Sequence, residues 1–377
     1  MTTRLREATS LAIQTGHPVI LWGGPGIGKT AWLRALAQAT RRHLEVLIGS
    51  LRDPVDFGGL PVVGEGGQFC LAPMPWVRRI QDMAADGRPS VLFLDELTTC
   101  PPAVQAAMLR VVLDRAVGEE ALPEDLWIVA AANPPEQAAG GLDLAAPLAN
   151  RFAHFEFGLD VREWAEGLRR GWPEPDIPVL PGTWRELVPQ ARAVVAAFVE
   201  ARPQLLHRVP DDPGEAGRAW PSPRTWSMAA DFVAAAMAMG RGEDMDLVAS
   251  LVGAAVGSGP ALEFAGWLRE ANLPRPEDLL ADPLGHPLPE RGDALMAALS
   301  AAIAEASKDV ASVRRYWDAV WRLVERVCGM GFADLAAGAI GPLSAIWKAR
   351  AADLFDLLPP RWVQERMGHI LAVARPK

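Results

Sequence analysis

The sequence has few of the features that mark membrane, secreted and zinc-binding proteins. No uninterrupted apolar stretch approaches the ~20 residues of a membrane-spanning helix, and no signal-like apolar segment follows the charged first residues. Three cysteines are widely separated, and six histidines show no zinc-ligand spacing. We therefore expect Cys70, Cys100 and Cys328 to be buried thiols of a cytoplasmic protein.

Positive charge is also scarce. Lysine and arginine total 37 against 46 acidic residues, so the net charge is −9. A general nucleic-acid binder normally carries a basic footprint, so this balance argues against that class while leaving a local basic channel open. The sequence shows no convincing internal repeat and no low-complexity tail. At 377 residues, half of them hydrophobic, the chain should form two or three compact units.

The most specific motif is a complete phosphate-binding loop. Residues 23–30 read Gly-Gly-Pro-Gly-Ile-Gly-Lys-Thr, after the apolar run 19–22 and before an amphipathic stretch. Glycines let backbone N–H groups surround phosphates, Lys29 can reach the β- and γ-phosphates, and the Thr30 hydroxyl can ligate Mg²⁺. The sequence thus predicts a nucleoside triphosphate site formed by Gly24, Pro25, Gly26, Ile27, Gly28, Lys29, Thr30 and Ala31.

A second apolar run, residues 91–94, ends in Asp95 and Glu96. The run is long enough for a buried parallel strand, and ligands of open α/β sheets bind at the carboxyl ends of such strands. We expect Asp95 to hold the Mg²⁺ shell and Glu96 to polarise the attacking water as a general base. The paired carboxylates favour hydrolysis over passive binding.

Strand and helix patterns alternate over the first 158 residues. This predicts an α/β fold, a doubly wound parallel five-stranded sheet, with a further short hairpin across Gly66 and Gly67. The expected strands are 19–22, 44–48, 91–94, 127–132 and 153–157. Proline-rich connectors then separate helical stretches, which predicts helical regions at 159–272 and 290–377. Spacing places Trp317 and Trp321 on the apolar face of one helix, so we expect most of the 14 tryptophans to pack in cores.

The order of these motifs resembles the AAA+ ATPase family. The run Ala131 to Gln137, the later Asn150-Arg151-Phe152 and the segment Asp53 to Gly59 are similar to the MoxR branch in particular, which inserts a hairpin into its second helix. The resemblance is strong over residues 5–160, moderate to about 257, and not usable beyond about 285. It implies a core, a helical lid at 159–272 and a C-terminal helical region.

The resemblance also implies roles for residues outside the loop. Asn133 matches the sensor 1 position, where a polar side chain contacts the γ-phosphate or the water. Arg151 matches the arginine finger that reaches a neighbouring subunit's site, with Arg115 as the fallback. Asn150 stands where the family often has an acidic residue. Arg224, in the first turn of a helix capped by Ser222, resembles sensor 2 and would contact the γ-phosphate of its own subunit.

The resemblance implies that the chain binds Mg²⁺-ATP between the subunits of a hexameric ring and does chaperone-like work on a protein partner. That partner often has a von Willebrand factor A domain, and the hairpin near 60–72 would face the partner or the pore. Two other classes stay open. One is a nucleotide-switched assembly scaffold with little turnover; the other is a nucleic-acid-stimulated motor. Guanine in place of adenine is a minor further alternative.

Overall fold

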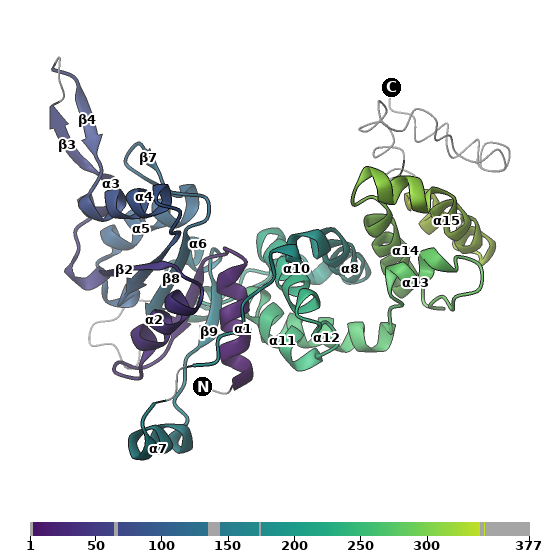
Figure 1. Cartoon of the computed structure of the whole chain (residues 1–377), viewed down its shortest axis with the longest axis horizontal. Coiled ribbons are helices and arrows are strands. Elements are labelled where there is room, and N and C mark those ends of the chain that lie inside the picture. The colour runs from purple at the N-terminus through teal and green to yellow at the C-terminus, as the bar shows by residue number, and fades with distance from the viewer. Residues whose placement is uncertain (1–2, 64–66, 135–143, 173–174, 340–342, 344–377) are drawn as a thin grey trace. The chain divides into compact units, whose positions relative to one another are not determined.

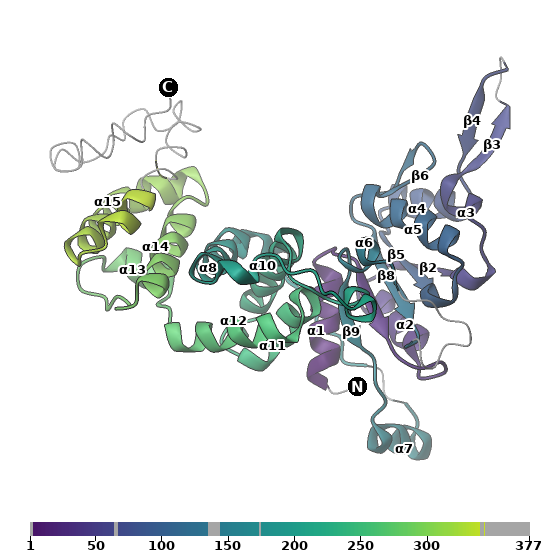
Figure 2. The same ribbon diagram turned by 180° about the vertical axis from the view of Figure 1, so that it is seen from behind.

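The computed structural model describes residues 3–63, 67–134, 144–172, 175–339 and 343. Contacts among them divide the chain into two compact units (Figures 1 and 2). Unit 1 comprises Met1–Pro181 and His207–Leu262, and unit 2 comprises Gly182–Leu206 and Glu263–Lys377. The candidate site residues all belong to unit 1.

A five-stranded parallel sheet forms the centre of unit 1, as the sequence predicts. Its strand order is β2-β5-β8-β1-β9, so β2 and β9 are its two edges. The central strands are fully buried runs of apolar side chains because helices cover both faces of a parallel sheet. The strands are β1 (Val19–Trp22), β2 (His43–Ile48), β5 (Ser90–Asp95), β8 (Trp127–Ala132) and β9 (Ala153–Glu156).

The helices around the sheet follow the apolar spacing of the sequence. In α2, the buried residues are Lys29, Trp32, Leu33, Leu36 and Ala37, which repeat at helical intervals. In α1, the chain leaves the helix at Gly16, whose φ of 89° suits glycine. The helices of this part are α1 (Thr3–Gln14), α2 (Lys29–Ala39), α4 (Pro75–Ala85), α5 (Pro102–Asp114), α6 (Ala146–Ala149) and α7 (Val161–Arg170).

The expected hairpin is present. After η1 (Gly49–Leu51) and the short α3 (Val55–Gly58), β3 (Leu60–Val63) pairs antiparallel with β4 (Phe69–Ala72). Val63 lies opposite Phe69, while the turn residues 64–66 lie outside the described residues. A second small ribbon joins β6 (Ala116–Val117) to β7 (Glu120–Ala121).

Unit 1 also contains the helix that carries Arg224. Ser222 caps α10 (Pro223–Ala238) in a capping box with Thr225, and Pro223 occupies the first turn, as expected from the sequence. The remaining helices of this part are α9 (Pro213–Ala216) and α11 (Met245–Val256), and α12 (Ser258–Ala271) begins there and ends in unit 2.

Unit 2 is helical and has its own core. Trp317 and Trp321 of α15 are buried with ring centroids 5.7 Å apart, which confirms their predicted packing role. The elements are η4 (Gly182–Leu187), α8 (Val188–Ala201), η5 (Pro203–Leu205), α13 (Pro276–Ala281), α14 (Gly292–Ala306) and α15 (Val310–Gly329). The three-part division at 159–272 and 290–377 stays a prediction.

Within the described ranges, no helix is both long enough and apolar enough to cross a membrane. The same residues contain no group of three or more histidine, cysteine or acidic side chains placed to hold a metal ion.

Candidate functional site

Three loops meet at the carboxyl edge of the sheet. The strand β8 pairs with both β1 and β5 in parallel, so the ends of these three strands lie side by side. The phosphate-binding loop follows β1, Asp95 ends β5, and Asn133 follows β8. The sequence predicted all three segments, and the sheet brings them together at one edge.

The loop after β1 has the backbone that only glycine adopts easily. Gly26 and Gly28 have φ values of 75° and 94°, and a Cβ at either would meet nothing within 4 Å. At Gly23 the constraint is space, because a Cβ would lie 2.3 Å from the carbonyl oxygen of Phe157. Gly28 precedes α2 without a side-chain cap, so the first N–H groups of the helix are available to an anion.

Lys29 folds back over this loop. Its Nζ donates to the carbonyl oxygens of Gly23, at 2.6 Å, and Gly24, at 3.1 Å, and to Asn133 Oδ1, at 3.3 Å. Burial lowers the pKa of Lys29, while the charges of Asp95 and Glu96 raise it. The ammonium is thus held in a partly desolvated position where a phosphate oxygen would be a stronger partner than these carbonyl groups.

Asp95 and Glu96 both act on the charge of Lys29, but Asp95 is half-buried and Glu96 is exposed. Burial raises the pKa of Asp95, an effect opposed by the hydrogen bond from the Glu96 N–H, at 2.9 Å, and by the charge of Lys29. Glu96 is exposed and has a φ of 58°, an uncommon conformation for a residue other than glycine. Such strain is typical of functional positions.

Ser50 is a residue of this site that the sequence analysis missed. Its Oγ donates a short hydrogen bond to Glu96 Oε2. Ser50 follows β2, which pairs with β5 so that Ile48 lies opposite Asp95. The close approach requires Gly49, because a Cβ there would lie 2.3 Å from Cys100 Sγ. The signal in the sequence is a Gly-Ser pair at the end of the strand next to the acidic strand.

Asn133 directly follows β8 and lies beside Lys29. In addition to its side-chain contact with Lys29, its backbone carbonyl accepts a hydrogen bond from Thr98 Oγ1, at 3.1 Å. Thr30, the other expected Mg²⁺ ligand, is half-buried in the first turn of α2. Neighbouring residues of the motif, Pro135 to Gln137, lie outside the described residues.

Arg151 and Arg224 lie near each other. Burial lowers the pKa of the Arg151 guanidinium, and the charge of Arg224 lowers it further, whereas Asp114 raises it. Arg224 Nη1 donates to Asn150 Oδ1 at 3.3 Å. Two like charges held close together form a surface suited to an anion.

Asn150 connects these arginines to the cap of α10. Its buried side chain accepts from Ser222 Oγ, at 2.9 Å, and donates to the carbonyl oxygen of Trp220, at 3.2 Å. With the contact to Arg224, the amide makes three hydrogen bonds across segments about seventy residues apart in sequence. This connection is a second feature that sequence reasoning did not find.

The guanidinium of Arg115 forms its hydrogen bonds within its own loop. Arg115 Nη2 donates to the carbonyl oxygens of Pro123, Glu124 and Leu126. Burial lowers the pKa of the Arg115 guanidinium, and the charges of Asp125 and Glu124 oppose this effect. An arginine with three backbone acceptors stabilises its own loop.

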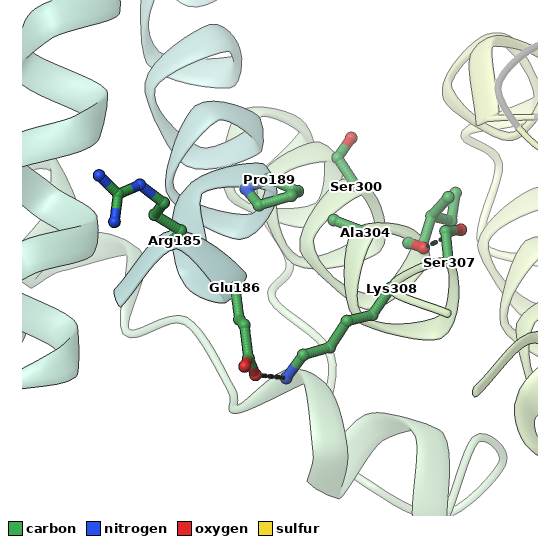
Figure 3. Close-up of a pocket in the computed structure, with 8 residues that line it drawn as sticks. Arg185, Glu186, Pro189, Ser300, Ala304, Ser307 and Lys308 are labelled. Carbon is green, nitrogen blue, oxygen red and sulfur yellow. Dashed lines mark hydrogen bonds and ion pairs between the residues drawn. The ribbon is translucent and has the colours of Figure 1, made fainter. Parts of the chain in front are cut away.

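A separate hollow in unit 2 contains none of these residues. It has a volume of about 550 Å³ and lies between the start of α8 and the end of α14 (Figure 3). Lys308 Nζ pairs with Glu186 at 2.9 Å on its rim, so the lysine charge is already neutralised. The candidate nucleotide site is therefore the edge of the sheet in unit 1.

Comparisons with known proteins agree with this geometry. Residues 18–152 match the AAA domain of the dynein-related subfamily. Over 114 residues the chain is 33% identical to Protein MoxR of Methylorubrum extorquens, covering 30% of this chain and 31% of that protein. Over 89 residues it is 32% identical to the proteasome-activating nucleotidase of Methanoregula boonei, covering 24% and 17%. The chain thus spans less than a third of either relative.

A solved structure of an inferred ATPase from Cytophaga hutchinsonii is similar with a TM-score of 0.42 and 20% identity, covering 62% of this chain and 74% of that chain. The matched AAA domain contains the phosphate-binding loop, the acidic strand end and Asn133 in the order that the geometry brings together. Residues 18–152 thus match an AAA domain, this part of the chain contains β1, β2, β5 and β8 of the five-stranded parallel sheet, and 114 residues of the chain are similar to MoxR.

Proposed function

We propose that this chain binds Mg²⁺-ATP at Gly24–Ala31 and hydrolyses it to ADP and phosphate at the subunit interfaces of an oligomeric ring. The observation that carries the proposal is the meeting of Lys29, Asp95, Glu96 and Asn133 at one edge of the sheet. A loop that only bound an anion would need no carboxylates beside its lysine. Hydrolysis additionally requires oxygen ligands for a metal ion and a base that accepts a proton from the attacking water.

The residues fit a Mg²⁺ ion because the Thr30 hydroxyl and the Asp95 carboxylate are hard oxygen ligands. When bound, the ion would supply neutralising charge to the β- and γ-phosphates. Lys29 would exchange its contacts with Gly23 and Gly24 for a phosphate oxygen. Glu96 would accept the proton of the attacking water, and Asn133 would orient that water or hold the γ-phosphate.

Arg151 and Arg224 would complete the site of a neighbouring subunit. Because the Arg224 charge acts on Arg151 and its side chain contacts Asn150, we propose that the two guanidiniums share one phosphate-facing surface. The resemblance alone implies a same-subunit role for Arg224. The proximity of the two charges instead supports joint action of Arg224 with Arg151, which would stabilise charge on the transferring phosphoryl group.

The free energy of ATP hydrolysis would drive remodelling or activation of a protein partner, as the resemblance to MoxR implies. A partner with a von Willebrand factor A domain, a hexameric ring and a cytoplasmic location are parts of the same proposal. The scaffold and nucleic-acid alternatives use the same nucleotide residues. They differ in turnover and in what stimulates it.

The test is ATP turnover per chain measured across protein concentrations, with Glu96→Gln as the blank. Specific activity that rises with concentration supports sites completed between subunits. Tight ATP-dependent assembly with negligible turnover would overturn hydrolysis as the function and favour the scaffold. Stimulation by DNA or RNA, and by no protein, would favour the motor.

A further inference from the structure

The hydroxyl of Thr98 makes an unusual hydrogen bond for a buried threonine. Thr9, which is equally buried, donates to the carbonyl oxygen of Leu5, four residues earlier in its own helix. Such local bonds are a common use of threonine hydroxyls. Thr98 Oγ1 instead donates to the backbone carbonyl of Asn133, 35 residues later in the chain, at 3.1 Å. The bond therefore joins two segments of the candidate site.

This bond lies beyond the end of the strand ladder between the two segments. The pairing of β5 with β8 ends with Leu94 opposite Ala130. The pairing of β8 with β1 continues to Ala132, which lies opposite Trp22. The chain after Leu94 and the chain after Ala130 thus lie outside the β5–β8 ladder. The hydroxyl of Thr98 connects them there.

Asn133 is held on both sides by backbone hydrogen bonds. The preceding carbonyl, of Ala132, accepts from the N–H of Gly23 in the phosphate-binding loop, at 3.0 Å. The carbonyl of Asn133 itself accepts from Thr98. Between these two bonds, the amide side chain of Asn133 reaches Lys29 Nζ at 3.3 Å. Loss of either bond would let the amide move, and the placement of a catalytic group depends on such supporting contacts.

The turn that carries Thr98 is also tied to Glu96. This turn, η2 (Leu97–Thr99), follows Glu96 directly. Thr99 Oγ1 donates back to the Glu96 carbonyl at 2.9 Å. From α5, the buried side chain of Gln105 donates to the Leu97 carbonyl at 3.4 Å. Because these bonds hold the turn, the place of the Thr98 hydroxyl is set relative to Glu96.

We propose that Thr98 is a positioning residue, whose hydroxyl fixes Asn133 relative to Glu96 and so controls turnover without contacting ATP. The inference rests on the proposed hydrolysis at this site. A base and an amide that act on one water or one phosphate must keep their mutual placement in the reaction step, whereas binding of the nucleotide depends on it less. Loss of the hydroxyl should therefore lower kcat and leave KM for ATP nearly unchanged.

Thr98→Ala and Thr98→Ser separate this role from packing. Both variants lack the methyl group of threonine, and they differ from each other only in the hydroxyl. In steady-state assays of the full chain, we expect kcat of Thr98→Ala to fall about tenfold, with KM for ATP changed by less than about twofold. Thr98→Ser should keep most of the wild-type kcat. Equal losses of kcat in the two variants would indicate packing alone and overturn the proposal.

Thr9→Ala is the matched control. Thr9 is as buried as Thr98 and also donates to a backbone carbonyl, but it lies in α1, which carries none of the candidate site residues. We expect its kcat per folded chain to stay within about twofold of wild type. Urea unfolding of every variant gives the folded fraction, so that unfolded protein is not counted in kcat. A loss in Thr9→Ala as large as that in Thr98→Ala would overturn the proposal.

A double-mutant cycle tests whether Thr98 acts through Asn133. In an Asn133→Ala background, Thr98→Ala should lower kcat by less than about twofold further, because no amide is left to position. The same loss as in the wild-type background would overturn the proposed path. Absence of turnover in wild type would refute the proposed hydrolysis and, with it, the role of Thr98. Turnover in wild type with an equal kcat in Thr98→Ala would refute only the role of Thr98.

Discussion

Ser50 holds Glu96 in place: its hydroxyl donates to Glu96 Oε2, while the glutamate backbone adopts a φ of 58°. If Glu96 is the general base, this contact fixes which oxygen faces the water. Ser50→Ala should therefore lower kcat by about three- to tenfold, since general-base efficiency depends on hydrogen-bond geometry. Affinity for ATP should change less than twofold because Ser50 contacts no residue of the phosphate loop in the described contacts.

The control for that prediction is Ser50→Thr, which keeps the hydroxyl and should retain most of kcat. Steady-state turnover and nucleotide binding measured on the same preparations separate the two effects. An unchanged kcat in Ser50→Ala would show that Ser50 does not position the base.

Lys29→Ala should abolish ATP binding. The ammonium of Lys29 is held over the loop, and its removal takes away the main positive charge for the phosphates. We expect affinity to fall by at least about a hundredfold, in line with loss of a partly buried charge-assisted contact. Titration with a fluorescent ATP analogue measures this. Lys308→Ala is the matched control, because Lys308 pairs with Glu186 in unit 2 and should leave affinity unchanged; equal binding by both variants would remove Lys29 from the site.

Much of the fold and of the site could be predicted from the sequence because the signals are local. The apolar runs of β1, β5 and β8, the helical spacing of α2 and the Ser222 cap of α10 each depend on neighbouring residues, and each is confirmed. The placement of Lys29 beside Asn133 follows from parallel strands that end at one edge.

The features that could not be predicted join distant segments. Ser50 reaches Glu96 only because β2 pairs with β5 and Gly49 permits close approach, and the side chain of Asn150 contacts residues 220–224. The exposure of the apolar face of α7 was equally hidden, because its spacing is that of an ordinary buried helix. Periodicity gives the face of a helix but not what covers it.

Arg151→Ala and Glu96→Gln should complement each other when mixed. A subunit with Arg151→Ala keeps its own Glu96, and a neighbour with Glu96→Gln can supply Arg151 to that site. Mixed rings should recover part of the wild-type turnover although neither variant is active alone. Turnover measured across mixing ratios tests this, with each variant mixed with itself as the control. Absence of recovery at every ratio would argue against a role for Arg151 in the neighbouring site.

Asn150→Ala should weaken the connection between the segment of Arg151 and α10. The change leaves the Trp220 carbonyl without its amide donor and removes the acceptor for Ser222 and Arg224. We expect a loss of about 1–3 kcal/mol in the free energy of unfolding, as for an unsatisfied buried polar group. Asn150→Asp keeps the acceptor but not the donor, so it should retain more of the turnover per folded chain. Urea unfolding alongside turnover distinguishes the two effects; equal stability of wild type and Asn150→Ala would contradict the prediction.

His154 should make the protein lose stability in mild acid. Its ring is half-buried and has two partners: Nδ1 accepts from Trp22 Nε1, at 2.9 Å, and Nε2 contacts the Ala149 carbonyl, at 2.9 Å. Burial lowers the pKa of His154 to about 4 from the ordinary 6.5, an effect that the charge of Arg218 strengthens. Between these values the unfolded chain binds a proton that the folded chain does not, so stability is complete above pH 6.5 and falls as the pH drops toward 4. The full loss would be about 3 kcal/mol.

The matched variant is His154→Gln, which can accept from Trp22 and donate to Ala149 but does not titrate. Urea unfolding of both proteins at pH 7.5 and pH 5 gives the measurement. We expect wild type to lose about 2 kcal/mol more than the variant over this interval, because the imidazole of wild type takes up a proton more readily in the unfolded chain whereas glutamine does not titrate. Since His154 lies in β9, three residues after Arg151, the same loss should appear as a fall in assembly at pH 5 that His154→Gln resists. Parallel pH profiles for the two proteins would show that another group sets the acid limit.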